Sequence, residues 1–199
     1  MKKIFLTTTL ILSIIISSFA QIPENAEDVT PIKIGEKIPS VELTSNKGEK
    51  INTLDIIKDK PSVVIFYRGG WCPFCNKHLE AIGQSEEEIL KLGYQIIAIS
   101  PDSPEKLNKT VSKNELNYSL YSDSEGKLMT EMGIAFQAPK RYKSMLEKYS
   151  DDKNSGLLPV PSLFVIGTNG NILYEYVNAD YKNRIDAGFL INLLKEQQK

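Results

Sequence analysis

Residues 62–75 read SVVIFYRGGWCPFC, and this stretch decides the fold. Its first part, Ser62–Tyr67, is an unbroken run of mainly β-branched and aromatic residues, which is typical of a strand buried on both faces of a sheet. Two glycines then form a turn, and Pro73 suits the first position of a helix, where its missing N–H would have no partner. The stretch therefore predicts a buried strand that leads directly into a helix, with Cys72 and Cys75 in the first helical turn.

Strand and helix patterns alternate through the rest of the chain. The helix that begins at Cys72 is expected to continue to Gly93, because glycine commonly ends a helix. The later predicted elements are a strand at 94–99, a helix capped by Asp102, a hairpin of strands at 163–166 and 172–177, and a last helix capped by Asp186. This order predicts an α/β fold in which helices cover a mixed sheet.

The N-terminus has the pattern of a secretory signal peptide. Two lysines precede an apolar run, and Ser18-Phe19-Ala20 places small residues at the −3 and −1 positions of a cleavage site. The alternative is a membrane anchor, but the run is shorter than the ~20 apolar residues that a span needs. We predict a signal peptide at 1–20, an extended leader at 21–34 and one domain at 35–199. The protein would then be periplasmic or secreted after cleavage near Ala20, with no stable membrane anchor.

The net charge and the cysteine content indicate which partners and which redox compartment to expect. The 199 residues include 24 basic and 25 acidic ones, for a formal net charge of −1. The basic residues are spread along the chain, so no nucleic-acid partner is expected. The chain has two cysteines, and export would place them where disulfides form.

The spacing of Cys72 and Cys75 indicates redox chemistry. Both sulfurs fall at the start of a helix, where unpaired N–H groups and the helix dipole stabilise a thiolate. The second cysteine can close a small ring and release what the first has captured. As a structural staple such a ring would constrain little of the unfolded chain. A structural zinc site needs four ligands, and His78 is the chain's one histidine. We therefore expect no metal and no cofactor.

Four segments resemble the peroxiredoxin-like branch of the alkyl hydroperoxide reductase/thiol-specific antioxidant (AhpC/TSA) family. They are Tyr67–Cys75, Ser100–Ser103, Leu158–Ile166 and Asn178–Arg184. The resemblance runs from about Ile34 to the last helix. It implies a thioredoxin-like fold, with a central mixed sheet and helices on both faces. It also implies an oxidoreductase that acts on a hydroperoxide and is reduced by a thioredoxin-like partner.

The resemblance gives the two sulfurs different roles in different alignments. Aligned to ordinary peroxiredoxins, Cys75 falls on the peroxidatic cysteine, Cys72 replaces a threonine that binds the peroxide, and Pro161 stands in place of an activating arginine. Aligned to thioredoxins, Cys72 is the nucleophile and Pro161 falls on a cis-proline that faces the pair. The thioredoxin alignment therefore predicts a cis Val160–Pro161 bond.

Two neighbours of the pair are further candidates. Arg68 can supply the missing positive charge, and Trp71 can form an apolar platform beside the sulfurs. The sequence leaves three functions open, of which hydroperoxide reduction by Cys75 with Cys72 resolving is preferred. The second is a thiol–disulfide oxidoreductase acting on protein disulfides, with Cys72 attacking and Cys75 resolving. The third is a non-catalytic binding module that responds to redox state through Trp71 and the cysteines.

Overall fold

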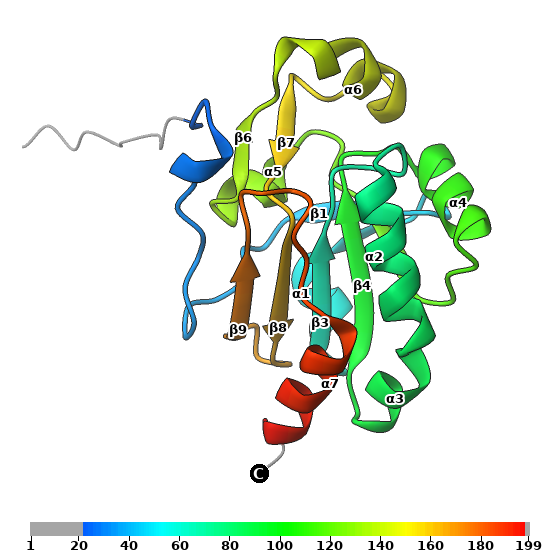
Figure 1. Ribbon diagram of the computed structural model, residues 1–199, viewed down its shortest axis with the longest axis vertical. Helices are drawn as coiled ribbons and strands as arrows, with labels where there is room; N and C mark the ends of the chain where they lie inside the picture. The colour runs from blue at the N-terminus through cyan, green and yellow to red at the C-terminus, as the bar shows by residue number, and fades with distance from the viewer. Residues whose placement is uncertain (1–21, 198–199) are drawn as a thin grey trace, which may run out of the picture.

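The computed structural model describes residues 22–197, so the predicted signal peptide lies outside the described residues. A seven-stranded sheet forms the centre of the fold, in the order β2-β1-β5-β4-β3-β8-β9, and β6 and β7 form a separate pair (Figure 1). The strands are β1 (Glu42–Ser45), β2 (Lys50–Asn52), β3 (Ser62–Phe66), β4 (Gln95–Ser100), β5 (Ser119–Ser122), β6 (Ala135–Gln137), β7 (Leu157–Pro159), β8 (Ser162–Ile166) and β9 (Ile172–Val177). The α-helices are α1 (Thr53–Ile57), α2 (Pro73–Gln84), α3 (Glu86–Lys91), α4 (Pro104–Lys113), α5 (Lys127–Glu131), α6 (Lys143–Ser150) and α7 (Ala187–Glu196).

The sheet is mixed, as the sequence predicts. β3 pairs in parallel with β4, where Val64 faces Ile97. On its other side β3 pairs antiparallel with β8, where Val64 faces Phe164. Because β3 has neighbours on both sides, the end of this strand, and the cysteine turn that follows it, are held at the middle of the sheet.

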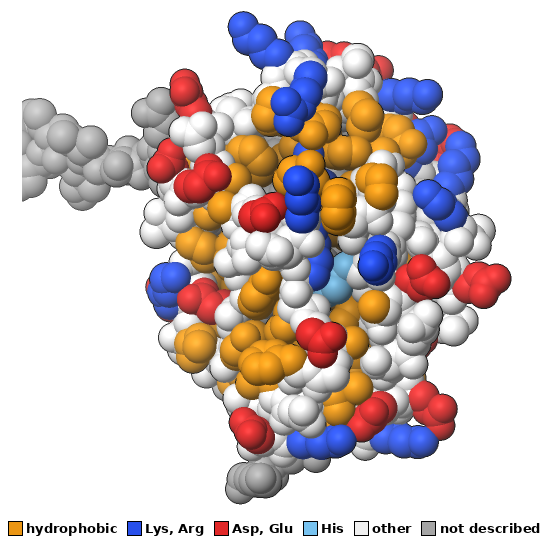
Figure 2. All heavy atoms as spheres, in the orientation of Figure 1, with side chains coloured by type: hydrophobic (Ala, Val, Ile, Leu, Met, Phe, Trp, Pro, Cys, Tyr) orange, Lys and Arg blue, Asp and Glu red, His pale blue; other side chains and the backbone are white. Residues whose placement is uncertain are grey.

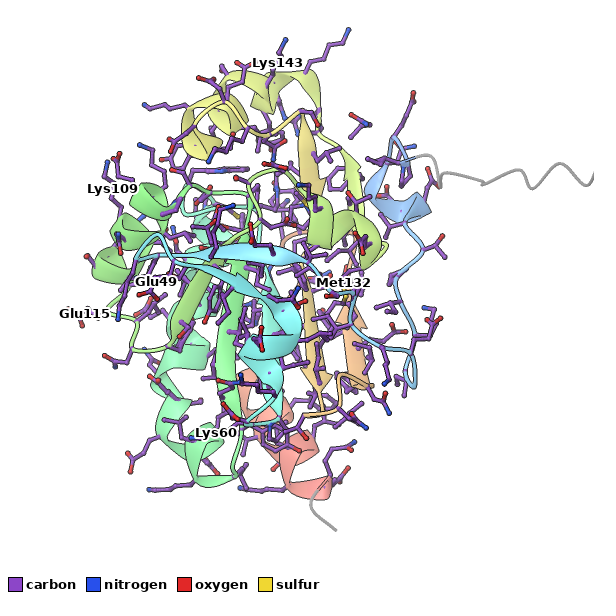
Figure 3. All side chains as sticks on the ribbon, turned by 180° about the vertical axis from the view of Figure 1, so that it is seen from behind. Glu49, Lys60, Lys109, Glu115, Met132 and Lys143 are labelled. Atoms are coloured by element: carbon purple, nitrogen blue, oxygen red, sulfur yellow. The ribbon has the colours of Figure 1, made fainter. Side chains whose placement is uncertain are left out.

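Alternate residues of β3 enter two separate hydrophobic clusters. Val63 and Ile65 pack with residues of α2, α3, α4 and α7 on one face, including Leu79. Val64 and Phe66 pack on the other face with α1, α5 and the segment before β1. Figure 3 shows α1 and the β1–β2 hairpin on the side of the molecule opposite α2 and α7. The unbroken apolar run of β3 is therefore explained by burial on both faces, and the predicted thioredoxin-like arrangement is confirmed.

Two details of the predicted helices are wrong. The helix expected to continue from Cys72 to Gly93 is broken at Ser85, which ends α2 and precedes α3. Asp102 does not cap the next helix, because Ser103 occupies the N-cap position before Pro104. The short helices α1 and α5 and the β6–β7 pair were not predicted from the sequence, since each has only three to five residues and so little periodic pattern.

The leader follows the edge of the domain and contains a short 3-10 helix, Ala26–Asp28. The N–H of Ile32 donates to the carbonyl of Met132 at 3.0 Å, which Figure 3 labels. The N–H of Gln137 donates to the carbonyl of Pro23 at 2.8 Å. These bonds hold the leader beside β6. None of the helices in residues 22–197 combines the length and the apolar character needed to span a membrane.

Candidate active site

The two cysteines lie where the sequence predicts, at the N-terminus of α2. Cys72 is the N-cap residue, and its Sγ accepts a hydrogen bond from the N–H of Cys75 at 3.3 Å. Both are free thiols, and they are 2% and 1% exposed, respectively. Both cysteine side chains are therefore shielded from solvent.

The environment of the pair favours a thiolate on Cys72. The pKa of Cys72 is lowered to about 6, first because the Cys75 thiol donates a hydrogen bond to it. The Cys75 N–H, Arg68 and Arg184 lower the pKa of Cys72 further. The pKa of Cys75 is raised, first by burial and then by the neighbouring Cys72 sulfur. At neutral pH the reduced pair thus holds one proton, on Cys75, and one negative charge, on Cys72.

Arg184 supplies a positive charge directly to Cys75. Its Nη2 lies 3.7 Å from Cys75 Sγ, and its Nη1 donates to the carbonyl of Asn183 at 2.7 Å. This residue comes from the loop before α7, and it brings to Cys75 a guanidinium that Pro161 cannot supply. Arg184 is not among the site residues that the sequence predicts. The available signal was its place within Asn178–Arg184, a segment that carries the family resemblance.

Arg68, which the sequence suggests as a source of positive charge near the cysteines, occupies a buried position. Its side chain is 4% exposed, and its guanidinium lies over the rings of Tyr181, Tyr142 and Trp71, with the guanidinium carbon at 4.4, 4.8 and 5.1 Å from their centroids. Its charge lowers the pKa of Cys72. Trp71 packs against Tyr142, with ring centroids 5.4 Å apart. Trp71 is thus one wall of an aromatic cage around Arg68.

The prediction of a cis Val160–Pro161 bond is wrong. Every peptide bond in the described part of the chain is trans. Pro161 is buried, and its carbonyl accepts the N–H of Asn178 at 3.3 Å, which ties the start of β8 to the end of β9. The X–Pro bond is trans in most folded proteins, and the thioredoxin alignment was the one reason to expect otherwise.

Asp102 supports the turn that carries the pair. Its Oδ2 accepts the N–H of Gly70 at 2.7 Å, and the carbonyl of Gly70 accepts Nδ2 of Asn76 at 2.9 Å. Burial raises the pKa of Asp102 to about 7. His78 is buried, and desolvation followed by the charge of Arg184 lowers the pKa of His78 to about 4, so its ring is neutral at neutral pH.

Thiol groups and positive charge are what the described residues bring together at this site. Within residues 22–197, no group of three or more His, Cys, Asp or Glu side chains is arranged to hold a metal ion. What the arrangement provides is two sulfurs in hydrogen-bond contact and two guanidinium groups that stabilise negative charge on them. Such an arrangement activates a thiol for attack on an electrophile and lets a second thiol close a disulfide.

Comparisons with known proteins point to the same chemistry. The family model described as "AhpC/TSA family" matches residues 34–175. Peroxiredoxin Bcp of Escherichia coli strain K12 is 29% identical over 168 residues, which cover 84% of this chain and 99% of that protein. Peroxiredoxin Bcp of Bacillus subtilis strain 168 is 30% identical over 154 residues, which cover 77% of this chain and 90% of that protein.

Solved structures share the fold at lower identity. The peroxidoxin BcpB of Mycobacterium tuberculosis has a TM-score of 0.66 and 21% identity, covering 83% of this chain and 97% of that one. Reduced Prx3 of Vibrio vulnificus, solved in complex with H2O2, has a TM-score of 0.70 and 15% identity, covering 84% and 98%. The family match and the peroxiredoxin relatives confirm the predicted enzyme. The chain belongs to the AhpC/TSA family of peroxiredoxins and is a thiol peroxidase.

Proposed function

We propose that this protein reduces hydroperoxides with Cys75 as the peroxidatic sulfur, and that Cys72 acts first as its base and then as the resolving thiol. The observation that carries the proposal is the contact of Arg184 Nη2 with Cys75 Sγ at 3.7 Å. A guanidinium at this place stabilises both the charge that develops on the attacking sulfur and the charge on the departing oxygen.

The first step moves a proton and transfers an oxygen. The proton of Cys75 passes to the Cys72 thiolate, with which it shares a hydrogen bond. The Cys75 sulfur attacks the terminal oxygen of ROOH, the O–O bond breaks, and Cys75 becomes a sulfenic acid. The alkoxide takes the proton from Cys72 and leaves as ROH, so the Cys72 thiolate is restored.

The second step closes the disulfide. The Cys72 thiolate attacks the Cys75 sulfur, the S–O bond breaks, and hydroxide leaves and is protonated to water. Cys72 and Cys75 then share a disulfide, and two electrons have passed to the peroxide. A dithiol protein of the thioredoxin type returns the pair to the reduced state by thiol–disulfide exchange. Peroxide consumption by the wild type, Cys72→Ser and Cys75→Ser, with such a reductant, tests the assignment.

A second function is favoured by one observation at Cys72. Its Sγ accepts the N–H of Cys75, and its pKa is lowered to about 6, as expected of a thiol that attacks protein disulfides. In that function Cys72 forms the mixed disulfide and Cys75 releases it. Formation of a mixed disulfide between Cys72 of the Cys75→Ser variant and a protein disulfide, in the absence of peroxide, would support it.

We expect the Cys72–Cys75 disulfide to change the stability of the fold only slightly. Closing so short a loop removes little chain entropy, worth about 2 kcal/mol at most, and for a domain of this size that corresponds to less than about 8 °C in Tm. Calorimetric melting of the fully oxidised and fully reduced protein measures the difference. Unfolding of the reduced form at 25 °C would show that the bond is structural rather than catalytic.

We propose that the protein is exported, with a mature N-terminus near Gln21. The support is the order of basic, apolar and small residues in positions 1–20. Intact-mass measurement of the protein from periplasmic and cytoplasmic fractions should find the cleaved form outside the cytoplasm. A control with Ala20→Arg, which places a large charged residue at the −1 position, should remain uncleaved. Recovery of wild-type protein with Met1 intact in the exported fraction would overturn the cleavage site.

A further inference from the structure

A pocket of about 210 Å³ is lined in part by the buried Arg68. Its apolar wall includes Phe136, Pro139 and Pro161, and its polar wall includes Arg68 and Arg141. Figure 2 shows Lys and Arg side chains set among hydrophobic ones near the end of the molecule that α6 occupies in Figure 1. The pocket thus combines positive charge with apolar surface.

The guanidinium of Arg68 is the unusual element of this pocket. It is buried, and in residues 22–197 no carboxylate lies within ion-pair distance of it. Its Nε has no hydrogen-bond partner among the described residues. The aromatic rings around it offset only part of its desolvation. A buried charge without a counter-charge is costly, so this position favours an anion.

In the reduced protein the Cys72 thiolate supplies negative charge near this guanidinium. The guanidinium carbon of Arg68 lies 5.1 Å from the ring centroid of Trp71, the residue before Cys72, and the charge of Arg68 lowers the pKa of Cys72. Formation of the disulfide removes the thiolate and leaves Arg68 without a counter-charge among the described residues. An anion that enters the pocket then replaces the charge that oxidation has removed.

We propose that the pocket on Arg68 binds an organic carboxylate with an apolar body, and binds it more tightly when Cys72 and Cys75 form a disulfide. The redox part of this proposal rests on the proposed disulfide cycle. The guanidinium groups of Arg68 and Arg141 both approach Tyr142, at 4.8 and 4.9 Å from its ring centroid, so two cations adjoin this ring in the lining of the pocket. A carboxylate matches the planar fork of a guanidinium.

The apolar walls determine the body of the ligand. Phe136, Pro139 and Pro161 line the pocket together with the arginines, and they favour a ring or short aliphatic chain over a hydrated inorganic anion. Glu24 and Glu27 also line the pocket, from the leader, but both are exposed and neither forms an ion pair with Arg141. Their charges are therefore weakened by solvent.

Because the coupling between two sites is reciprocal, a ligand in this pocket also shifts the redox equilibrium of the cysteine pair. A ligand that prefers the oxidised protein stabilises the disulfide by the same factor. We expect about tenfold tighter binding to the oxidised form, within the usual range of coupling between sites. At saturation this would lower the reduction potential of the pair by ~30 mV.

Calorimetric titration of the full protein with 3-phenylpropionate tests the proposal, with 3-phenylpropionamide as the uncharged control. The acid should bind the oxidised protein about tenfold more tightly than the reduced protein at pH 7.5, and the amide should bind neither measurably. The Cys72→Ser, Cys75→Ser double variant has neither thiolate and should bind the acid as tightly as the oxidised wild type. Equal affinity for the acid and the amide would overturn the carboxylate site. Equal affinity for the oxidised and reduced forms would overturn its link to redox state.

Two substitutions test whether the carboxylate binds to the arginines. Arg68→Gln should abolish binding, and Arg141→Gln, at an exposed position that can lose its charge without unfolding the domain, should weaken binding several-fold. Unchanged affinity in Arg141→Gln would contradict the assignment. A tripeptide ending in phenylalanine, as acid and amide, distinguishes a chain terminus from a free acid as the source of the carboxylate. Because no peroxide is present, failure of these titrations is distinct from failure of the proposed peroxidase cycle.

Discussion

Cys75→Ser is expected to reduce peroxide consumption to the background rate, a loss of about four orders of magnitude or more, as removal of a catalytic nucleophile produces in other enzymes. Serine keeps the size of the side chain, but its hydroxyl is far less acidic than a thiol and its oxygen does not form a sulfenic acid. Cys75 lies beside Arg184, and its thiol donates to Cys72. The measurement is the rate of peroxide loss with a saturating dithiol reductant.

Cys72→Ser is the matched control for that variant. It should consume one equivalent of peroxide and then stop, because the sulfenic acid on Cys75 has no resolving thiol. Loss of the neighbouring sulfur also removes two influences that raise the pKa of Cys75, a hydrogen bond and a like charge. The first turnover should therefore remain measurable at neutral pH. Full steady-state activity in Cys75→Ser would exclude the proposed role of Cys75.

Arg184→Met should lower the second-order rate constant for peroxide by about 10²–10³-fold, the usual loss when one charge-stabilising donor is removed from a transition state. Methionine keeps much of the length and apolar volume of the side chain but removes the group that lies 3.7 Å from Cys75 Sγ. The same substitution should raise the pKa of both cysteines, because Arg184 lowers both. Stopped-flow peroxide reduction as a function of pH measures both effects.

Lys182→Met is the matched control on the same loop. Lys182 is exposed and forms no ion pair with a described residue, so its loss removes one positive charge without touching the sulfurs. The second-order rate constant of Lys182→Met for peroxide should stay within about twofold of the wild-type value, since exposed charges at a distance are screened by salt. Equal losses of rate in Arg184→Met and Lys182→Met would mean that Arg184 acts through the overall charge of this loop and not through its contact with Cys75.

The parts of the fold that rest on local pattern were predictable. The strand Ser62–Phe66 and the cap at Cys72 follow from a run of apolar residues and from the proline at the next position. The break at Ser85 was not predictable in this way, because the helical pattern continues across it. Its neighbours Glu86 and Ile89 fit one continuous helix as well as two, and tertiary packing decides between them.

The contacts of the site are likewise of two kinds, local ones that the sequence predicts and distant ones that it does not. The approach of Cys75 to Cys72 is fixed by their spacing, whereas the contact with Arg184 joins residues 109 positions apart. No local pattern contains that contact. The aromatic cage of Arg68 likewise contains Tyr142, from a 3-10 helix before α6, and Tyr181, from the loop before α7. The sequence therefore showed a candidate cation but not its burial or its pocket.

The central claim is that the peroxide oxygen is transferred to Cys75. The most direct measurement is peptide mass spectrometry of Cys72→Ser and Cys75→Ser after one equivalent of hydroperoxide in the presence of dimedone, which labels sulfenic acids. The account predicts a dimedone adduct on Cys75 in Cys72→Ser, with one peroxide consumed per chain, and little or no adduct on Cys72 in Cys75→Ser. Rapid, stoichiometric labelling of Cys72 in Cys75→Ser, with none on Cys75 in Cys72→Ser, would contradict it.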